Sequence, residues 1–319
     1  MTWKNLIVKE KKDFGKNLYL NNMKTKAIIV GVKKFKLTEQ EKKLFKSFKP
    51  WGVILFSRNI KNINQLKLLT DEIRKIFNNK RFPIMIDQEG GKVSRLNEIL
   101  DFTAFSQTNL KNMYKKNKKL FYSIYEIYAK EVCDIFHSTG ININTSPVLD
   151  IKRKNAHQLI GSRSFSNNVK DVVYLGNVCV ELFKKRKILT VTKHIPGHGL
   201  ANKDSHFDTP LINAKKEILE KNDFKAFKLC KSFFSMTCHA IFSFYDKHNV
   251  ATHSKKIIHN VIRKNIGFKG LLITDDISMK SLKYNLETNA LKALDAGCNL
   301  ALHCNGNIRE MYKLAKVIP

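Results

Sequence analysis

Short runs of apolar and β-branched residues recur along the chain, and polar loop residues follow each of them. Runs of this length, bounded by polar residues, are typical of buried β-strands. We therefore expect strands at eight places, which are residues 26–32, 51–57, 82–87, 141–147, 188–194, 233–240, 270–276 and 299–305.

The stretches between several of these runs repeat apolar positions at three- and four-residue steps, as amphipathic helices do. At the start of one of them Thr38 precedes Glu41 by three residues, which is the spacing of a helical capping box. The apolar periodicity predicts helices over residues 37–48, 62–77, 120–136, 214–230 and 307–318.

The alternation of strands and helices implies parallel strands joined by right-handed crossovers. A (β/α)8 barrel, the α/β fold also called the TIM barrel, consists of eight such units. A doubly wound open sheet is the competing arrangement, but no GxGxxG motif follows the first strand. Because no linker rich in Pro, Gly or Ser interrupts the pattern, we expect a single barrel domain over residues 1–319, with about the first 20 residues peripheral to it.

The chain is strongly basic, with 58 Lys and Arg against 27 Asp and Glu, which gives a net charge of +31. Such a charge favours a nucleic acid or an anionic membrane surface as a partner. Only nine of the basic residues are Arg, the residue preferred for phosphate forks and base contacts, and the lysines are spread over the whole chain. We therefore predict a solvated basic surface, with neither nucleic acid nor membrane as partner. A basic binding protein that touches RNA without catalysis is the alternative.

The cysteines and the apolar stretches bear on the location of the protein. The six cysteines form no CxxC motif, and we interpret them as reduced residues of an intracellular protein. The first 14 residues lack the apolar core of a signal peptide, and the apolar-rich stretch 233–245 is too short and too polar to cross a bilayer. A cytoplasmic location is therefore predicted.

Polar residues that can carry chemistry follow several of the expected strands. In a (β/α)8 barrel, catalytic residues gather at the C-terminal ends of the strands and in the loops beyond them. The residues at those points are Asp87 to Gly91, Asp150, Lys193, His194, His239, Asp275, Asp276 and Asn305. We expect an active site at this rim.

The loop from Pro196 to about residue 213 follows the fifth expected strand and contains two glycines and two prolines. A long loop of this kind in a compact domain is functional or disordered. Together with His194, its histidines His198 and His206 make a set of three that zinc could use. However, Pro196 opposes a helix between the first two of them, and we predict no metal and no cofactor. The alternative is a mobile surface loop whose histidines do nothing.

Asp204 and His206 suggest proton transfer instead. Side chains two residues apart in an extended segment point to the same side, so Asp204 can orient the imidazole of His206 and stabilise its protonated form. Imidazole ordinarily titrates near ~6.5 and serves as acid and then base around neutral pH. Such a pair needs a partner for covalent chemistry, and Asp275 at the end of a buried strand is the candidate nucleophile. The alternative is that Asp275 or Asp276 caps a helix that begins near Ser278.

Several longer strings resemble the motifs of one enzyme family, glycoside hydrolase family 3, and its bacterial β-N-acetylhexosaminidase branch. In order, they are IDQEGGKVSRL (86–96), SPVLDI (146–151), GSRSF (161–165), KHIPGHG with DSHFDTP (193–210) and GFKGLLITDDISMK (267–280). Weaker likenesses at 251–257 and 294–305 extend the resemblance over nearly the whole chain.

The resemblance implies a (β/α)8 barrel, and it implies roles for individual residues. Asp275 matches the nucleophile, His206 the acid/base and Asp204 the partner that orients His206. The positions that match sugar-binding residues of the family are Asp87, Arg95, Arg163, Lys193 and His194.

The implied reaction is retaining hydrolysis, in which Asp275 forms a glycosyl-enzyme and His206 serves first as acid and then as base. The implied enzyme is a monomeric exo-acting β-N-acetylglucosaminidase. Its substrates would be small carbohydrates, either N-acetylglucosaminyl-anhydro-N-acetylmuramyl peptides from peptidoglycan recycling or chito-oligosaccharides. Phosphorolysis on the same site and a β-glucosidase specificity remain as alternatives.

The chain departs from the family pattern in three ways. Ser162 stands where the family has Asp in GDRSF, which puts the anchoring of Arg163 in doubt. Lys92 stands where Arg is common. The chain ends soon after the last expected strand, so no further C-terminal domain is expected.

Overall fold

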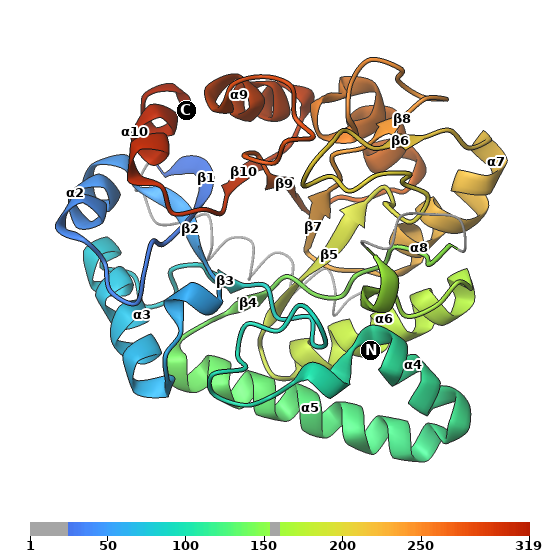
Figure 1. The fold of residues 1–319 in the computed structure, drawn as a ribbon, viewed down its shortest axis with the longest axis horizontal. Helices are drawn as coiled ribbons and strands as arrows, with labels where there is room; N and C mark the ends of the chain where they lie inside the picture. The colour runs from blue at the N-terminus through green and yellow to red at the C-terminus, as the bar shows by residue number, and fades with distance from the viewer. Residues whose placement is uncertain (1–24, 154–159) are drawn as a thin grey trace, which may run out of the picture.

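Eight parallel strands close into a barrel in the computed structural model, which describes residues 25–153 and 160–319 (Figure 1). The strands pair in the order β1, β10, β9, β7, β5, β4, β3, β2 and back to β1. Their bounds are β1 Lys26–Gly31, β2 Pro50–Leu55, β3 Ile84–Ile86, β4 Ile143–Asn144, β5 Leu189–Ile195, β7 Phe234–Thr237, β9 Leu271–Asp276 and β10 Leu300–His303. All eight expected strands and the barrel are confirmed; the expectation for about the first 20 residues lies outside the described residues.

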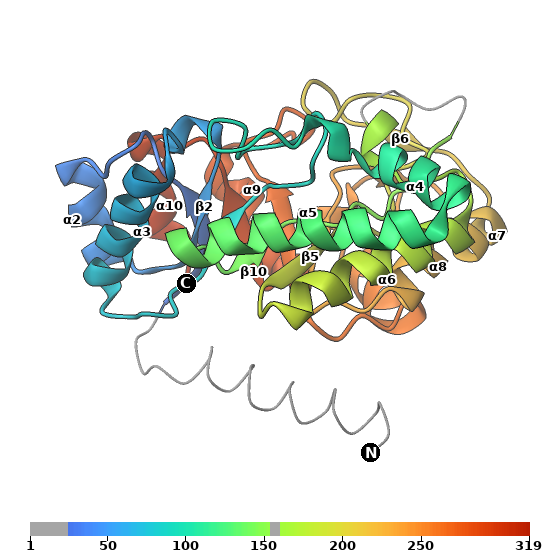
Figure 2. The same ribbon diagram turned by 90° about the horizontal axis from the view of Figure 1, so that it is seen from below.

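Helices surround the barrel, and each crossover between barrel strands carries helical structure (Figure 1). The α-helices are α2 Glu39–Phe48, α3 Ile63–Phe77, α4 Gln107–Lys116, α5 Lys118–Thr139, α6 Val169–Lys185, α7 Lys216–Ile218, α8 Phe224–Leu229, α9 Leu286–Ala296 and α10 Ile308–Val317. Wider π-helical turns form η4 Leu219–Asp223 and η6 Ile257–Asn265. Figure 2 shows that α5 runs along most of the width of the molecule.

The expected capping box is present, because the Thr38 hydroxyl accepts from the N–H of Glu41 and the Glu41 carboxylate accepts from the N–H of Thr38. The alternative prediction of a helix that begins near Ser278 is wrong. Asp276 instead accepts hydrogen bonds from the N–H and hydroxyl of Ser278 and closes a turn, and α9 begins only at Leu286, with Asn285 as its N-cap.

Two apolar layers hold the fold together. One fills the barrel interior with side chains from every strand, among them Ile29, Ile54, Met85, Ile143, Val191, Phe234, Ile273 and Leu302. The other packs the outer faces of the strands against the helices and includes Phe45, Phe121, Phe136, Phe183 and Ile262. Because the interior is packed, the polar groups at the strand ends lie at the mouth of the barrel.

The loop after β5 is more ordered than its composition indicated. It ends in a short strand, β6 (Leu211–Ile212), which pairs in parallel with β8 (Ile241–Phe242) outside the barrel. Its first half packs tightly, since a Cβ added at Gly199 would lie 2.1 Å from the carbonyl oxygen of Ile151. The glycine therefore permits a close approach of backbone to backbone.

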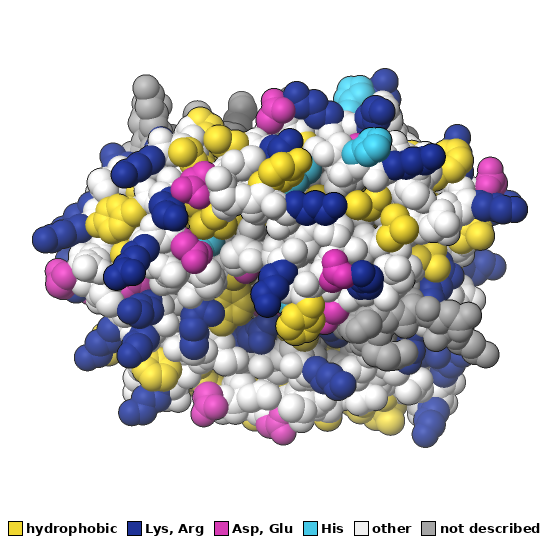
Figure 3. Space-filling model, turned by 45° about the horizontal axis from the view of Figure 1, so that its top comes forward, with side chains coloured by type: hydrophobic (Ala, Val, Ile, Leu, Met, Phe, Trp, Pro, Cys, Tyr) yellow, Lys and Arg dark blue, Asp and Glu magenta, His cyan; other side chains and the backbone are white. Residues whose placement is uncertain are grey.

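On the face that Figure 3 shows, Lys and Arg are spread among neutral, apolar and acidic side chains and form no single stripe. In the described part of the chain, no helix is both long and apolar enough to cross a bilayer. All six cysteines are free thiols, and all but the half-buried Cys304 are buried.

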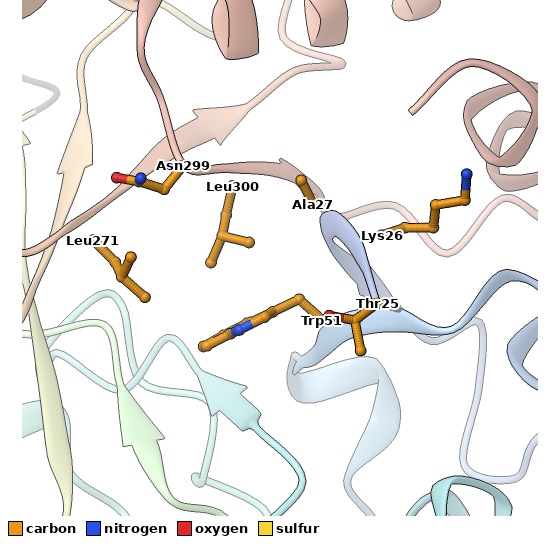
Figure 4. A pocket seen from close by; sticks show the side chains of 7 residues that line it. All are labelled: Thr25, Lys26, Ala27, Trp51, Leu271, Asn299 and Leu300. Atoms are coloured by element: carbon orange, nitrogen blue, oxygen red, sulfur yellow. The ribbon is translucent and has the colours of Figure 1, made fainter. Parts of the chain in front are cut away.

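A small pocket of about 180 Å³ opens at the opposite end of the barrel from the polar rim (Figure 4). It is lined by residues at the beginnings of β1, β2, β9 and β10, namely Thr25, Lys26, Ala27, Trp51, Leu271, Asn299 and Leu300. This end of a (β/α)8 barrel serves stability, and the chemistry belongs to the other end.

Candidate active site

Asp87, just beyond β3, is held by two cations and a hydroxyl. Lys193 of β5 places its Nζ 2.5 Å from Asp87 Oδ1, and Arg95 donates from Nη2 to Oδ2 at 2.8 Å. Thr145 donates its hydroxyl to Oδ1 at 2.6 Å. Burial opposes ionisation of Asp87, but the charges of Lys193 and Arg95 outweigh it and lower its pKa well below the ordinary value. The side chain is 16% exposed, so this charged group borders the solvent.

Glu89 is a second buried carboxylate, and it connects Lys193 to Arg163. Arg163 donates from Nε and Nη2 to the two oxygens of Glu89 at 2.9 and 2.8 Å, and Lys193 Nζ lies 2.6 Å from Oε1. Burial raises the pKa of Glu89, but the charges of Arg163 and Lys193 bring it below the ordinary value. The anchor of Arg163, in doubt because of Ser162, is therefore this two-pronged contact with Glu89.

Sequence reasoning assigned Glu89 no role, although a signal was present. Glu89 follows Asp87 by two residues directly after a strand, and side chains at that spacing point to the same side of an extended chain. Both carboxylates therefore meet the same lysine.

His194 lies between two carboxylates. Its Nδ1 donates to Oδ2 of Asp150 at 2.6 Å, and its Nε2 lies 4.0 Å from Oδ2 of Asp275. Asp150 is completely buried after β4, and it also accepts from the backbone N–H of His198 at 2.6 Å. Burial opposes ionisation of Asp150, but His194 lowers its pKa below the ordinary value.

Asp275 stands at the C-terminal end of β9 with its side chain 22% exposed. One of its oxygens accepts from the N–H of Asp276 at 2.8 Å. Burial alone would raise the pKa of the Asp275 carboxyl, but His194, His239 and that N–H bring it below the ordinary value. The carboxylate is therefore charged at neutral pH and borders the mouth of the barrel.

His239 is a buried neighbour of Asp275. Its Nε2 donates to the carbonyl oxygen of Asp276 at 3.0 Å, and its Nδ1 accepts from the Thr252 hydroxyl at 2.7 Å. Burial lowers the pKa of His239. With both ring nitrogens engaged, His239 supports the backbone beside Asp275.

His206 and Asp204 form the pair that their spacing predicts. Asp204 accepts from both Nδ1 and the backbone N–H of His206 at 2.8 Å, and the His206 side chain is 56% exposed. Within the described residues no hydrogen bond or ion pair joins His206 to Asp275.

The loop that carries His206 contacts the segment that follows Asp275. The Thr209 hydroxyl donates to the carbonyl oxygen of Ser281 at 2.8 Å, and Lys280 Nζ lies 6.0 Å from the centre of the Phe207 ring. These contacts tie the loop after β5 to the loop after β9, at the same rim of the barrel.

The three histidines of the loop region do not share a metal site. His194 pairs with Asp150 and His206 with Asp204, whereas the ring of His198 is buried and its nitrogens have no hydrogen-bond partner in the described structure. Burial lowers the pKa of His198 to about 4, so its ring is neutral. Across residues 25–153 and 160–319, no group of three or more His, Cys, Asp or Glu side chains is arranged to hold a metal ion.

The bridge between Lys193 and Arg163 makes a prediction about stability. Glu89→Ala is expected to lower the free energy of unfolding by about 3–5 kcal/mol, because it leaves the mostly buried Arg163 guanidinium without its carboxylate and Lys193 with Asp87 alone. Chemical denaturation at pH 7 measures the change. As a control, Asp71→Ala removes an exposed ion pair with Lys67 and should leave the unfolding curve nearly unchanged. Equal small effects of both substitutions would show that the Glu89 bridge is not structural.

Comparison with known proteins adds to this geometry. The model of the family described as "Glycosyl hydrolase family 3 N terminal domain" matches residues 20–319. A beta-hexosaminidase of Psychromonas ingrahamii is 32% identical over 87% of this chain and 82% of its own length. One of Haemophilus influenzae is 30% identical over 88% of this chain and 79% of its own length.

A solved structure shares the fold of the whole barrel. NagZ from Neisseria gonorrhoeae, in complex with N-trifluoroacetyl-D-glucosamine, superposes with a TM-score of 0.82 at 28% identity, over 92% of this chain and 85% of that one. The beta-N-acetylglucosaminidase from Thermotoga maritima superposes with a TM-score of 0.75 at 25% identity, over 91% of this chain and 60% of that one.

Proposed function

Because the chain belongs to glycoside hydrolase family 3 and is a glycoside hydrolase, we propose that it is a retaining exo-β-N-acetylglucosaminidase with Asp275 as its nucleophile. The observation that carries the proposal is the Asp275 carboxylate, charged and partly exposed, at the mouth of the barrel and 4.0 Å from Nε2 of His194. The names of the relatives support an N-acetylhexosamine as the sugar.

In the proposed first step, an oxygen of Asp275 attacks the anomeric carbon as the bond from that carbon to the leaving oxygen breaks. His206, in its protonated form, gives a proton to the leaving oxygen. In the second step His206 takes a proton from water, and the water oxygen displaces Asp275 and restores the free carboxylate. Retaining glycosidases ordinarily use two carboxylates, so the His206–Asp204 pair takes the place of the second one.

The sugar is proposed to bind against the charged network at the rim, which consists of Asp87, Arg95, Arg163, Lys193 and His194. The ion pairs among these residues and Glu89 hold the polar groups in place before substrate arrives. Groups that are fixed in advance lose little conformational entropy on binding, which favours a precise fit for the sugar hydroxyls.

The natural substrate is proposed to be a fragment of peptidoglycan, with a chito-oligosaccharide as the second class. The net charge of +31 attracts acidic molecules, and muramyl peptides carry carboxylates. The proposal gives the protein a small carbohydrate as its partner, with no nucleic acid and no membrane. It describes a monomer that acts in the cytoplasm in peptidoglycan recycling and uses no cofactor.

Phosphorolysis on the same site is a second candidate. A neutral imidazole beside the acceptor repels an anion less than a carboxylate does, and the His206 ring is 56% exposed. In that reaction phosphate, instead of water, would release the sugar from Asp275 as a 1-phosphate.

The direct test is release of 4-methylumbelliferone from its β-N-acetylglucosaminide and its β-glucoside, with and without phosphate. The proposal expects turnover of the N-acetyl sugar alone, with free N-acetylglucosamine as product. Formation of sugar 1-phosphate would identify a phosphorylase. Folded protein that is silent on both sugars and binds RNA would support the non-catalytic alternative.

A further inference from the structure

Asp150 is completely buried and is connected to the active site through hydrogen bonds with His194 and His198. Its Oδ2 accepts from Nδ1 of His194 at 2.6 Å, and its Oδ1 accepts from the backbone N–H groups of His194 at 3.3 Å and His198 at 2.6 Å. The three hydrogen bonds that the carboxylate accepts among the described residues are thus directed at one turn of chain, at the point where β5 leaves the barrel.

This contact decides which nitrogen of His194 faces the site. An ionised carboxylate can only accept, so the Nδ1 that meets Asp150 carries a hydrogen. The opposite nitrogen, Nε2, is the one 4.0 Å from Oδ2 of Asp275. That separation is too long for a direct hydrogen bond and leaves the ring beside the carboxylate without bonding to it.

We propose that Asp150 is a positioning residue for the glycosidase reaction, fixing the ring of His194 with its hydrogen on Nδ1 so that Nε2 faces Asp275. The inference rests on the proposed function, because it takes Asp275 as the nucleophile. A carboxylate behind a ring holds its orientation and its tautomer, as the buried aspartate of a Ser-His-Asp triad does. With the hydrogen held on Nδ1, Nε2 is the nitrogen that the ring presents to Asp275 and to the bound sugar.

Other charged and titratable groups also face this pair. They are Asp87, Arg163, Lys193, His198, Cys238, His239, Asp276 and Cys304, which come from the ends of β3, β5, β7, β9 and β10 and from the turn before α6. Burial leaves the two remaining imidazoles, His198 and His239, neutral at pH 7, and burial raises the pKa of both thiols.

The test is the split between kcat and KM for Asp150→Asn. Asparagine has one oxygen, which can accept from the backbone N–H groups of His194 and His198, so its amide nitrogen faces Nδ1 of His194. The amide donates to Nδ1 and moves the hydrogen of the ring to Nε2, which is the wrong tautomer for the site. We expect kcat to fall tenfold or more, with a smaller change in KM.

Asp223→Asn is the matched control. Asp223 is also a fully buried carboxylate, and it pairs with Arg153 and not with His194. Asp223→Asn therefore removes a buried charge without touching His194, and kcat should stay within about tenfold of the native value. An equal fall of kcat in both variants, or no fall in Asp150→Asn, would overturn the proposal.

Two further measurements test the role of the His194 ring directly. In a His194→Gln background, Asp150→Asn should lower kcat hardly any further, because Asp150 acts through the His194 ring. If the two substitutions instead lower kcat independently of each other, the proposal is contradicted. If Asp150→Asn does not fold, nitrogen-15 NMR of the native protein still reports the ring, and an unprotonated Nδ1 on His194 would refute the proposal. If Asp275→Asn is active, the proposed function itself is refuted. If Asp275→Asn is inactive but Asp150→Asn has normal activity, only the role of Asp150 is refuted.

Discussion

Asp275→Asn is expected to lower kcat for N-acetylglucosaminide hydrolysis on the order of 10⁴-fold or more, because an amide cannot form the glycosyl-enzyme. The fold should persist, since Asp275 is at the end of β9 and its side chain accepts a hydrogen bond from the adjacent backbone N–H of Asp276. The rate is measured with the 4-methylumbelliferyl substrate, and folding with circular dichroism.

The neighbouring carboxylate provides a matched control. Asp276→Asn changes the same functional group one residue along, where the side chain holds the turn at Ser278. The amide oxygen of asparagine can still accept from the N–H of Ser278, and its NH2 can donate to the Ser278 hydroxyl, so activity should stay within about tenfold of the native value, which corresponds to 1.4 kcal/mol. Comparable activity of the two variants would exclude Asp275 as the nucleophile.

His206→Ala should slow substrates with poor leaving groups most. A leaving group such as methylumbelliferone departs without a proton, whereas the alkoxide of a disaccharide does not. We expect kcat/KM to fall about 10²- to 10⁴-fold on a disaccharide, which is the usual contribution of a general acid, and much less on the fluorogenic substrate. The comparison uses kcat/KM because kcat also reports the second step, where His206 acts as base.

Two other variants test the role of His206 further. Asp204→Asn keeps a hydrogen-bond acceptor for Nδ1 of His206 but removes the charge, so its effect should have the same direction and a smaller size. His248→Ala removes another exposed histidine and should change neither substrate. Equal losses on both leaving groups in His206→Ala would mean that His206 is not the acid.

The barrel could be predicted because its strands are buried on both faces. A strand such as β1, with Ile28, Ile29 and Val30 all fully buried, gives a continuous apolar run that stands out from its polar surroundings. β6 and β8 were missed because each has only two residues and pairs outside the barrel, and β8 lies within the apolar-rich stretch 233–245 directly after β7. The late start of α9 was missed because Asp276 and Ser278 have the composition of a helix start but form a turn.

Most residues of the candidate site could be predicted from the sequence, but several of the contacts between them could not. The rim position of Asp87, Lys193, His194 and Asp275 follows from the strand ends, and the contact of Asp204 with His206 follows from their spacing. The contacts of Glu89 with Arg163 and of Asp150 with His194 join residues 74 and 44 positions apart. No local periodicity reports such pairings, because they depend on how the barrel closes.

In the proposed mechanism Asp275 bears the sugar between the two steps. A 5-fluoro derivative of an N-acetylglucosaminyl fluoride reacts quickly and leaves slowly, so the glycosyl-enzyme accumulates and its mass can be measured after proteolysis. We expect one added sugar on the peptide that contains residues 271–276, located on Asp275, and no such adduct in Asp275→Asn. An adduct on another residue, or steady turnover with no adduct at all, would contradict it.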